Sequence, residues 1–234
     1  MTDLLFRDDP YLTEATAIVV DHTAEGAIVL DRSLFYPTGG GQPGDSGWLT
    51  HDTGRLVVAT TVKVEGGRVG LVPAEPLAMP AIGSTVMQHL DWDRRYRHMR
   101  VHTALHLLSV VIPLPVTGGQ IGAERGRLDF DMPDAPGDTA AWEAALNDLI
   151  DLDLPVTVEW ITDAALALNP GLVKTMSVQP PVGQGRVRLV RIGDIDLQPC
   201  GGTHVARTGE IGRVEIGRVE KKGRQNRRVS LTLV

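Results

Sequence analysis

The first 90 residues alternate between short apolar runs rich in β-branched residues and segments of turn-forming residues. The runs lie at 15–20, 27–30, 55–64 and 68–72. Glu65, Gly66 and Gly67 separate the last two runs, and such a glycine-containing connection is typical of a β-hairpin. Several short strands joined at regular intervals by turns predict a small β-barrel or sandwich. Three prolines between residues 73 and 80 interrupt this pattern, so we place a domain boundary near residue 90.

The apolar spacing changes to a helical period after residue 90. Residues 91–112 carry apolar side chains about one turn apart, and Pro113 ends the segment because proline cannot continue a helix. A second helix is expected from Thr139 to about Leu152, with Asp138 as its N-cap. A short helix is expected at 163–168, and strands at 127–132, 155–161 and beyond residue 187. Helices and strands mix without βαβ regularity, which predicts an α+β fold. We expect a small β-barrel over residues 1–90 and a two-layer α+β domain over residues 91–234.

Composition and charge restrict the cellular setting that we expect. The chain of 234 residues has 42% hydrophobic residues, which is ordinary for a globular protein, and a net charge of −6. Its single cysteine excludes an internal disulfide bond and suits a reducing compartment. The N-terminus carries acidic residues where a signal peptide needs basic ones, and no apolar run reaches the roughly 18 residues that a membrane helix requires. We therefore expect a cytoplasmic protein without a membrane segment.

Basic residues are concentrated near the C-terminus. Residues 205–234 carry eight lysines and arginines against three glutamates, so this segment has a charge of +5 in an otherwise acidic chain. The densest cluster consists of Lys221, Lys222, Arg224, Arg227 and Arg228. A second cluster of arginines lies at 94–100. Each cluster is either a solvated surface or a set of contacts with nucleic-acid phosphates.

Three histidines, His98, His102 and His106, are spaced four residues apart in the first expected helix. Residues four apart lie on one face of a helix, so an adjacent pair could hold one metal ion. The only cysteine, Cys200, lies in a glycine-rich turn that also contains His204. Thiolate and imidazole are ligands that zinc prefers, normally four in a tetrahedron. The sequence therefore predicts a zinc (Zn2+) site formed by His102, His106, Cys200 and His204.

Two features of this site stay open. The pair His98 and His102 has the same spacing as His102 and His106, and His204 either binds the metal or lies behind it. Three protein ligands would leave a position for water, as in catalytic sites, whereas four would close the site. A zinc peptidase is not expected. Its motif His-Glu-x-x-His places a glutamate next to the first ligand, and this chain has Thr103 there.

Three blocks of sequence together point to one family. The first is the glycine-rich block at 35–47; the second is the histidine block at 102–108, followed by the segments at 120–122 and 128–131; the third is the block at 191–204. In this order, the blocks resemble those of the alanyl-tRNA editing proteins (the AlaX family), freestanding relatives of the editing domain of alanyl-tRNA synthetase. The likeness spans nearly the whole chain.

The resemblance implies a zinc-dependent esterase that acts in trans, without ATP, on tRNA(Ala) mischarged with serine or glycine, and so protects translation fidelity. It also implies that a β-barrel precedes an editing domain and that His102, His106, Cys200 and His204 form the metal site. The substrate bond is an ester between the aminoacyl group and the terminal ribose. Zinc would either activate water and polarise the carbonyl, or hold the substrate's amino group.

Further site residues follow from the same resemblance. Gln120 matches a family position near the reacting group, although an exposed strand glutamine is the alternative. Thr103 would give a hydroxyl to the pocket, or cap its own helix. The glycine-rich block is no P-loop; it forms either two tight turns or a border of the substrate site. The residues that would border the substrate are Thr38, Gly40, Gly41 and Gln42, and those that would contact tRNA are Lys221, Lys222, Arg224, Arg227 and Arg228.

A serine hydroxyl distinguishes the wrong amino acid from alanine. A pocket that hydrogen-bonds this hydroxyl can strongly reject the molecule that lacks it. Thr38 and Thr103 are the candidates for this recognition.

The sequence leaves three alternative functions open. Threonyl-type aminoacyl-tRNA editing is one, but threonyl-tRNA synthetases lack the glycine-rich barrel block, which favours the alanine system. A zinc hydrolase of small esters would act on free esters and would not need the basic cluster. A structural-zinc RNA-binding module would have a closed four-ligand site and would bind tRNA without turnover.

Overall fold

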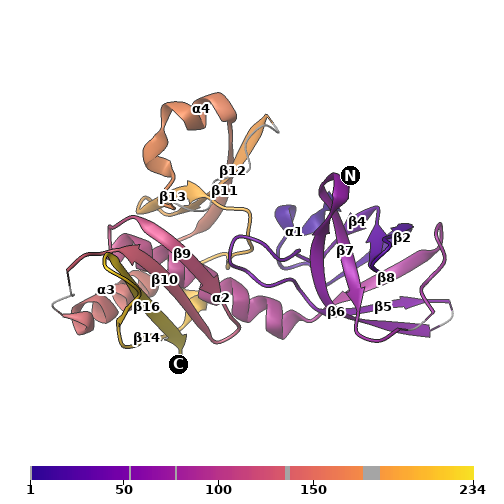
Figure 1. The fold of residues 1–234 in the computed structure, drawn as a ribbon, viewed down its shortest axis with the longest axis horizontal. Coiled ribbons are helices and arrows are strands. Elements are labelled where there is room, and N and C mark those ends of the chain that lie inside the picture. Colours follow the sequence, from indigo (N-terminus) through magenta and orange to yellow (C-terminus); the bar gives the residue numbers. More distant parts are fainter. Residues whose placement is uncertain (1, 53, 77, 135–137, 176–184) are drawn as a thin grey trace. The chain divides into compact units, whose positions relative to one another are not determined.

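A computed structural model describes residues 2–52, 54–76, 78–134, 138–175 and 185–234 of the chain (Figure 1). The chain divides into two compact units, Met1–Tyr96 and Arg97–Val234. Helices and strands are mixed, which confirms the expected α+β class. No helix among the described residues is long and apolar enough to cross a membrane.

The first unit is built on a closed barrel of six strands, in the order β2–β3–β7–β6–β5–β8. Alternate residues such as Ala17 and Val19 are buried in the barrel, while Ile18 between them is exposed. A closed barrel has no free edge, because every strand has a partner on both sides. The barrel expected from the alternating pattern is therefore confirmed. Its strands are β2 (Glu14–His22), β3 (Ile28–Leu30), β5 (Gly47–His51), β6 (Gly54–Val64), β7 (Arg68–Pro73) and β8 (Thr85–Leu90).

Four short elements complete the first unit. They are β1 (Asp3–Leu4), which pairs in parallel with β4 (Arg32–Ser33), the helix α1 (Leu5–Asp8), and the 3-10 turn η1 (Glu65–Gly67) that joins β6 to β7.

The glycine-rich segment between β4 and β5 is fastened to the start of helix α2 (Trp92–Val111) by a buried ion pair. Asp45 and Arg95 are both fully buried, and Nε of Arg95 donates to Asp45 at 2.9 Å. Arg95 also donates to the carbonyl oxygen of Leu34 at 2.7 Å, and Asp45 accepts from the backbone N–H of Tyr36 at 2.6 Å. A buried ion pair needs such additional hydrogen bonds to offset its lost solvation.

Helix α2 begins in the first unit and continues into the second, where it packs on one face of an antiparallel sheet. The close approach requires Gly126, since a Cβ at this position would lie 2.5 Å from the Val101 side chain. Helix α3 (Thr139–Asp151) begins at its expected N-cap, where Asp138 accepts from two backbone N–H groups. The strands, in spatial order, are β14 (Val214–Ile216), β16 (Asn226–Leu233), β10 (Arg125–Asp131) and β9 (Val116–Ile121), with β15 (Glu220–Lys221) paired to β16.

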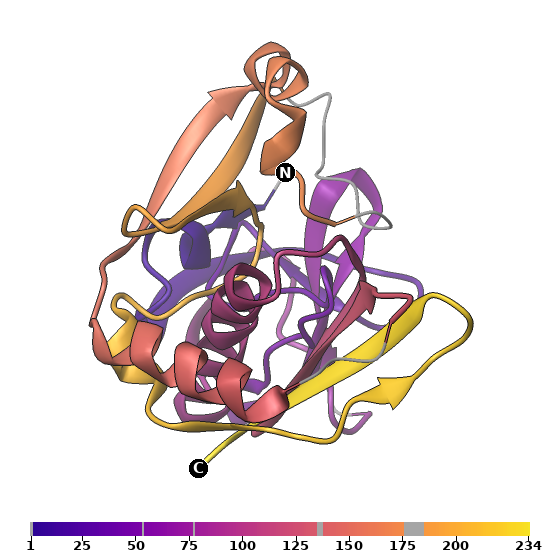
Figure 2. The same ribbon diagram turned by 90° about the vertical axis from the view of Figure 1, so that its left-hand side faces the viewer.

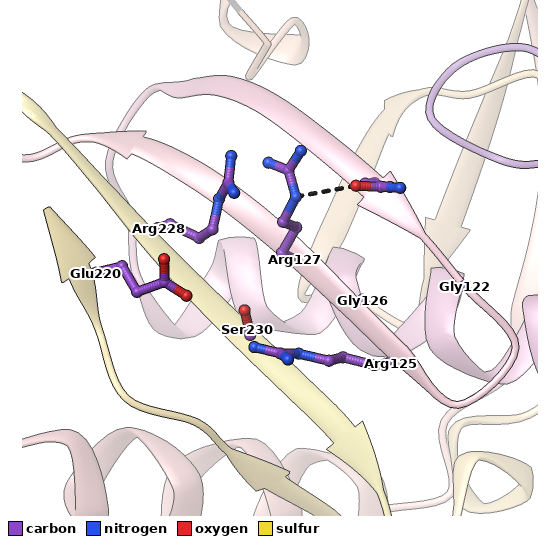
Figure 3. Close-up of a pocket in the computed structure, with 8 residues that line it drawn as sticks. Gly122, Arg125, Gly126, Arg127, Glu220, Arg228 and Ser230 are labelled. Carbon is purple, nitrogen blue, oxygen red and sulfur yellow. Dashed lines mark hydrogen bonds between the residues drawn. The ribbon is translucent and has the colours of Figure 1, made fainter. Parts of the chain in front are cut away.

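The other face of this sheet carries polar and charged side chains (Figure 3). Successive residues of a strand point to opposite faces. On β10, the buried residues Gly126, Leu128 and Phe130 therefore face the helix side, while Arg125 and Arg127 point away from it. One face of the sheet is covered by helices and the other carries charged groups.

A second, three-stranded sheet belongs to the same unit (Figure 2). Its strands are β11 (Val156–Thr162), β12 (Arg186–Ile192) and β13 (Asp196–Pro199). The helix α4 (Asp163–Leu168) follows β11, and two 3-10 turns, η2 (Pro170–Leu172) and η3 (Thr208–Ile211), lie in the connections. Strand β13 leads directly into the turn that contains Cys200, so this sheet positions the cysteine.

Candidate metal centre

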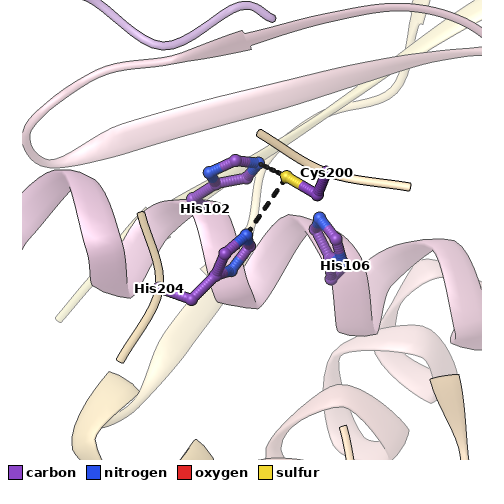
Figure 4. Close-up of side chains that lie close together, drawn as sticks. All are labelled: His102, His106, Cys200 and His204. Atoms are coloured by element: carbon purple, nitrogen blue, oxygen red, sulfur yellow. Dashed lines mark hydrogen bonds between the residues drawn. The ribbon is translucent and has the colours of Figure 1, made fainter. Parts of the chain in front are cut away.

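Four possible metal ligands converge in the second unit (Figure 4). His102 and His106 come from helix α2, and Cys200 and His204 from the turn after β13, and their ligand atoms all lie within 4.8 Å of one another. The Sγ of Cys200 lies 3.2 Å from Nε2 of His204 and 3.5 Å from Nε2 of His102. Three imidazoles and one thiol match the donor set of a tetrahedral zinc site. The geometry therefore fits one ion held by all four side chains.

The position of Cys200 depends on hydrogen bonds between the first residues of β12 and the turn after β13. The backbone N–H of Cys200 donates to the carbonyl oxygen of Arg188, and the Arg188 guanidinium donates back to the carbonyl oxygens of Cys200 and Gly202. Arg188 is itself buried. The backbone N–H of Gly202 also points at Sγ of Cys200, at 3.4 Å. The turn is thereby held in the conformation that presents the sulfur to the histidines.

His106 is oriented by a buried carboxylate. Its Nδ1 lies 3.2 Å from Oδ2 of Asp196, so Nδ1–H donates to the carboxylate and Nε2 is left for a metal ion. Asp196 is held in turn by Nζ of Lys174 at 2.5 Å and by Nε2 of Gln198 at 2.8 Å. Carboxylate partners of this kind fix the ring orientation of metal-binding histidines. Sequence reasoning assigned Asp196 no role, because an aspartate four residues before the only cysteine carries no pattern that ties it to a histidine on α2.

Thr103 orients His204, as Asp196 orients His106. Its hydroxyl is fully buried and donates to the carbonyl oxygen of Met99 at 2.9 Å, one turn earlier in α2. The same oxygen lies 3.1 Å from Nδ1 of His204 and accepts from the backbone N–H of Val205 at 3.3 Å. Because the hydroxyl proton is committed to Met99, Nδ1 of His204 is the donor in this contact. The neutral ring then presents Nε2 towards Cys200.

The surroundings of Cys200 and His204 suit metal binding, whereas His106 would have to release a proton to bind a metal. Burial raises the pKa of the Cys200 thiol, but the charges of His102 and His204 and further hydrogen bonds lower it well below its ordinary value. Burial, together with the charge of His102, lowers the pKa of His204 well below its ordinary value, which favours the neutral ring. Metal binding requires a thiolate and neutral imidazoles. Cys200 and His204 are therefore disposed to these forms by their surroundings.

His106 and Asp196 behave as a coupled pair. Burial lowers the pKa of His106, but hydrogen bonds to Asp196 and Cys200 outweigh it and raise this pKa to about 9. Burial raises the pKa of Asp196, whereas the hydrogen bond and charge of His106 lower it to about 2. Asp196 is therefore ionised and remains a strong acceptor for Nδ1–H of His106.

The alternative metal-binding pair, His98 with His102, is not found in the part of the chain that the structure describes. Among the described residues, the group that could hold a metal consists of the four side chains above and does not include His98, which is buried elsewhere along α2.

The other expected site residues lie outside this cluster, on β9 and in the glycine-rich loop of the first unit. Gln120 is exposed on β9, and its Oε1 accepts from Nε of Arg127 at 3.1 Å. In the first unit, the Thr38 hydroxyl donates to the carbonyl oxygen of Thr61 and accepts from the backbone N–H of Gly44, so it stabilises the glycine-rich loop. Gly40 and Gly41 have φ of 58° and 82°, which favours glycine, and Gln42 is buried. Their roles towards substrate stay predictions.

The basic cluster is partly engaged within the chain. Lys222 pairs with Glu220 at 2.8 Å, and Arg228 donates to both carboxylate oxygens of Asp129, at 2.8 and 3.0 Å. Arg227 donates to the carbonyl oxygen of Pro133 at 2.9 Å. Lys221 and Arg224 are exposed.

Two family models match the chain. The model described as "Threonyl and Alanyl tRNA synthetase second additional domain" matches residues 187–230, which include Cys200 and His204. The model described as "tRNA synthetases class II (A)" matches residues 11–94.

Similar proteins cover the full chain. An "Alanyl-tRNA editing protein AlaX-M" of Methanosarcina acetivorans is 36% identical over 244 residues, covering all of both chains. An "Alanyl-tRNA editing protein AlaX-L" of Pyrococcus horikoshii is 34% identical over 251 residues, which are 99% of this chain and 58% of that protein. An "Alanine--tRNA ligase" of Pyrobaculum calidifontis is 35% identical over 232 residues, or 93% of this chain and 25% of the ligase.

Proposed function

Because the chain belongs to the family of alanyl-tRNA editing proteins, we propose that it is a zinc-dependent deacylase acting in trans on tRNA(Ala) mischarged with serine or glycine. The bond to be hydrolysed is the ester between the amino acid and the terminal ribose. The observation that carries this proposal is the convergence of three histidines and the only cysteine, with two of the histidines oriented by further buried partners. We propose that the protein works in the cytoplasm.

The four convergent side chains would hold the ion, either all as ligands or three as ligands with one position left open. In the second case, a zinc ion would lower the pKa of a bound water to about 7 and polarise the ester carbonyl, or would hold the substrate's amino group. The chain's own contribution is to keep the ligands in place. Asp196 fixes the ring of His106, Thr103 fixes that of His204, and Arg188 fixes the turn that carries Cys200.

The substrate-facing roles are assigned as follows. The family resemblance implies that Gln120 contacts the reacting group or a water. Its side chain lies beside Arg127 on the sheet face that α2 does not cover, so this role requires the charged tRNA to reach that face. The hydroxyl of Thr103 already has three partners, so we propose that Thr103 contributes through the orientation of His204. Thr38, Gly40, Gly41 and Gln42 would border the aminoacyl group, with Thr38 near the serine hydroxyl. Lys221, Lys222, Arg224, Arg227 and Arg228 would contact the tRNA backbone.

Substitution of Cys200 by alanine tests the proposal. Cys200→Ala should lose both bound zinc, measured by mass spectrometry of the metal, and hydrolysis of serine-charged tRNA(Ala). Thr85→Ala, which shortens an exposed side chain of β8 outside the glycine-rich block, is the control and should retain both. If the Cys200→Ala variant deacylates at the wild-type rate with its zinc gone, the metal has no part in the reaction.

One observation also supports a second candidate, a structural-zinc module that binds tRNA. Four protein ligands would complete a tetrahedron and leave no position for water. This candidate predicts tRNA binding without turnover. Hydrolysis of free seryl esters but not of charged tRNA would instead indicate a small-ester hydrolase, and preference for serine-charged tRNA(Thr) would indicate threonyl-type editing.

A further inference from the structure

A pocket lies on the open face of the four-stranded part of the sheet, on the side away from helix α2 (Figure 3). It has a volume of about 310 Å³. Three arginines from two strands project at it, together with a glutamate and a serine. Its lining residues are Gln120, Gly122, Arg125, Gly126, Arg127, Glu220, Arg228 and Ser230.

The strand register builds the floor of this pocket. Arg127 is paired with Gln120 on one side and with Ser230 on the other, which places these three residues in one row across the sheet. Arg228 is paired with Asp129 and with Glu220, which forms the neighbouring row. Directly paired residues lie on the same face of a sheet. Two hairpins that are distant in sequence, β9–β10 and β15–β16, therefore contribute to one surface.

Two of the three arginines are already held by a carboxylate. Arg127 donates to Asp129 at 2.8 Å, and Arg228 donates to both oxygens of the same group. Burial raises the pKa of Asp129, but these hydrogen bonds outweigh it and lower that pKa, so the carboxylate is ionised. Arg127 and Arg228 are thus fixed in place, and they share one negative charge between them.

Arg125 differs from these two arginines. Within the described part of the chain, its guanidinium makes no hydrogen bond and no ion pair, and the side chain is exposed beside the pocket. The nearby carboxylate of Glu220 is paired with Lys222 at 2.8 Å, and the charges of Arg228 and Arg125 also help to lower its pKa. The pocket therefore contains three guanidinium groups, and that of Arg125 keeps its hydrogen-bond donors available for an anionic ligand.

The surroundings of the pocket are positively charged, in contrast to the whole chain. Segments 124–131 and 220–228 carry seven basic and four acidic residues, a charge of +3, whereas the chain as a whole has a charge of −6. A local field of this sign raises the local concentration of anions. Planar guanidinium groups match the oxygens of a phosphate group, which they can bind in pairs of hydrogen bonds.

We propose that this pocket binds a backbone phosphate of tRNA, with Arg125 as the direct contact and Arg127 and Arg228 as its fixed neighbours. The proposal rests on the proposed function and specifies where the polynucleotide is held. The metal cluster lies on α2 and the pocket on the sheet face that α2 does not cover. A substrate that reaches both must extend beyond the edge of the sheet, which a tRNA can do and an amino-acid ester cannot.

Binding of uncharged tRNA(Ala), followed by fluorescence anisotropy over a series of salt concentrations, tests the proposal. Arg125→Gln should weaken binding by about 3- to 10-fold and reduce the slope of log K against log salt by about 0.7 to 0.9, the range for one lost phosphate contact with single-stranded or duplex nucleic acid. Arg125→Glu should weaken binding further, because it places a second carboxylate near Glu220. Arg213→Gln, an exposed arginine outside the pocket, is the matched control and should bind like wild type.

A short substrate separates phosphate binding from catalysis. With the seryl ester of adenosine, which has no backbone phosphate, Arg125→Gln should keep the wild-type kcat/KM. If Arg125→Gln binds tRNA with the wild-type affinity and salt slope, the pocket proposal is overturned. It is also overturned if the control Arg213→Gln loses as much tRNA affinity as Arg125→Gln does. If Arg125→Gln weakens tRNA binding but the wild-type protein does not deacylate charged tRNA, the pocket stands and the proposed function fails.

Discussion

Asp196 acts on the metal site only through His106, and this makes it a sensitive test of how the ligands are positioned. Asp196→Asn keeps the shape of the side chain but removes the charge that Nδ1–H of His106 faces. We expect zinc affinity, measured by competition with a chromogenic chelator, to fall by about 10- to 100-fold. Asp153→Asn, which alters an exposed pair with Arg207, is the control and should leave zinc affinity unchanged. Equal zinc affinity in Asp196→Asn and wild type would show that the carboxylate does not orient the ring.

Asp129 provides a pH-dependent contribution to stability. Hydrogen bonds from Arg228 and Arg127 hold its pKa below the ordinary value of 3.8 in the folded protein. A depressed pKa stabilises the fold above the unfolded pKa, and this contribution is lost as the pH falls through the folded pKa. The difference in unfolding free energy between wild type and Asp129→Asn, from urea titrations, should be present at pH 7. It should shrink as the pH falls below about 4. If the difference in unfolding free energy grows as the pH falls, the ionised form of Asp129 does not stabilise the fold.

The convergence of the four candidate metal ligands could be anticipated from sequence because the residue types are chemically specific. His102 and His106 have helical spacing, and Cys200 and His204 share one turn. These two pairs are recognisable as candidate metal ligands in the sequence, even though 94 positions separate His106 from Cys200. The orienting partners could not be anticipated in the same way. Threonine and aspartate have many ordinary uses, and only the folded chain shows that Thr103 and Asp196 face the outer nitrogens of two histidines.

At the scale of elements, the packing of α2 on β10 depends on Gly126. In Gly126→Ala, the new Cβ would lie 2.5 Å from the Val101 side chain and 3.0 Å from that of Leu105, both in the helix that carries His102 and His106. Overpacking of this kind typically costs about 1–3 kcal/mol of unfolding free energy. Gly171→Ala, where a Cβ meets nothing within 4 Å, should be close to neutral. Urea unfolding of the two variants compares these effects, and equal stability would show that α2 does not require the glycine.

Elements with strong periodic patterns were predictable, and those without them were not. Four of the barrel strands (β2, β3, β6 and β7), α2 and α3 follow from apolar runs or helical apolar spacing, and the Asp138 cap marks the start of α3. The barrel strands β5 and β8 were not expected. Strand β9 was not expected, because Gly118 and Gly119 in its centre have low strand propensity. It forms through its pairing with β10, a long-range contact that local pattern does not report.

At the scale of the whole molecule, the boundary between the two units along the chain falls within helix α2 rather than in a linker. The sequence pattern changes near residue 90, where β8 ends, but the structure divides the chain between Tyr96 and Arg97. The first turn of α2 belongs to the first unit because Arg95 is buried there against Asp45. Sequence shows where one type of element gives way to another, whereas the division between units depends on which side chains are buried together.

The most direct test of the central claim is the rate of deacylation of charged tRNA(Ala) by the metal-loaded protein. Serine-charged and alanine-charged tRNA(Ala) are compared with the protein as purified, after chelation, and after zinc is restored. We predict rapid loss of serine, little loss of alanine, a stop on chelation and recovery with zinc. Absence of serine release by the zinc-loaded protein would contradict the proposed function, and equal release of serine and alanine would contradict its specificity.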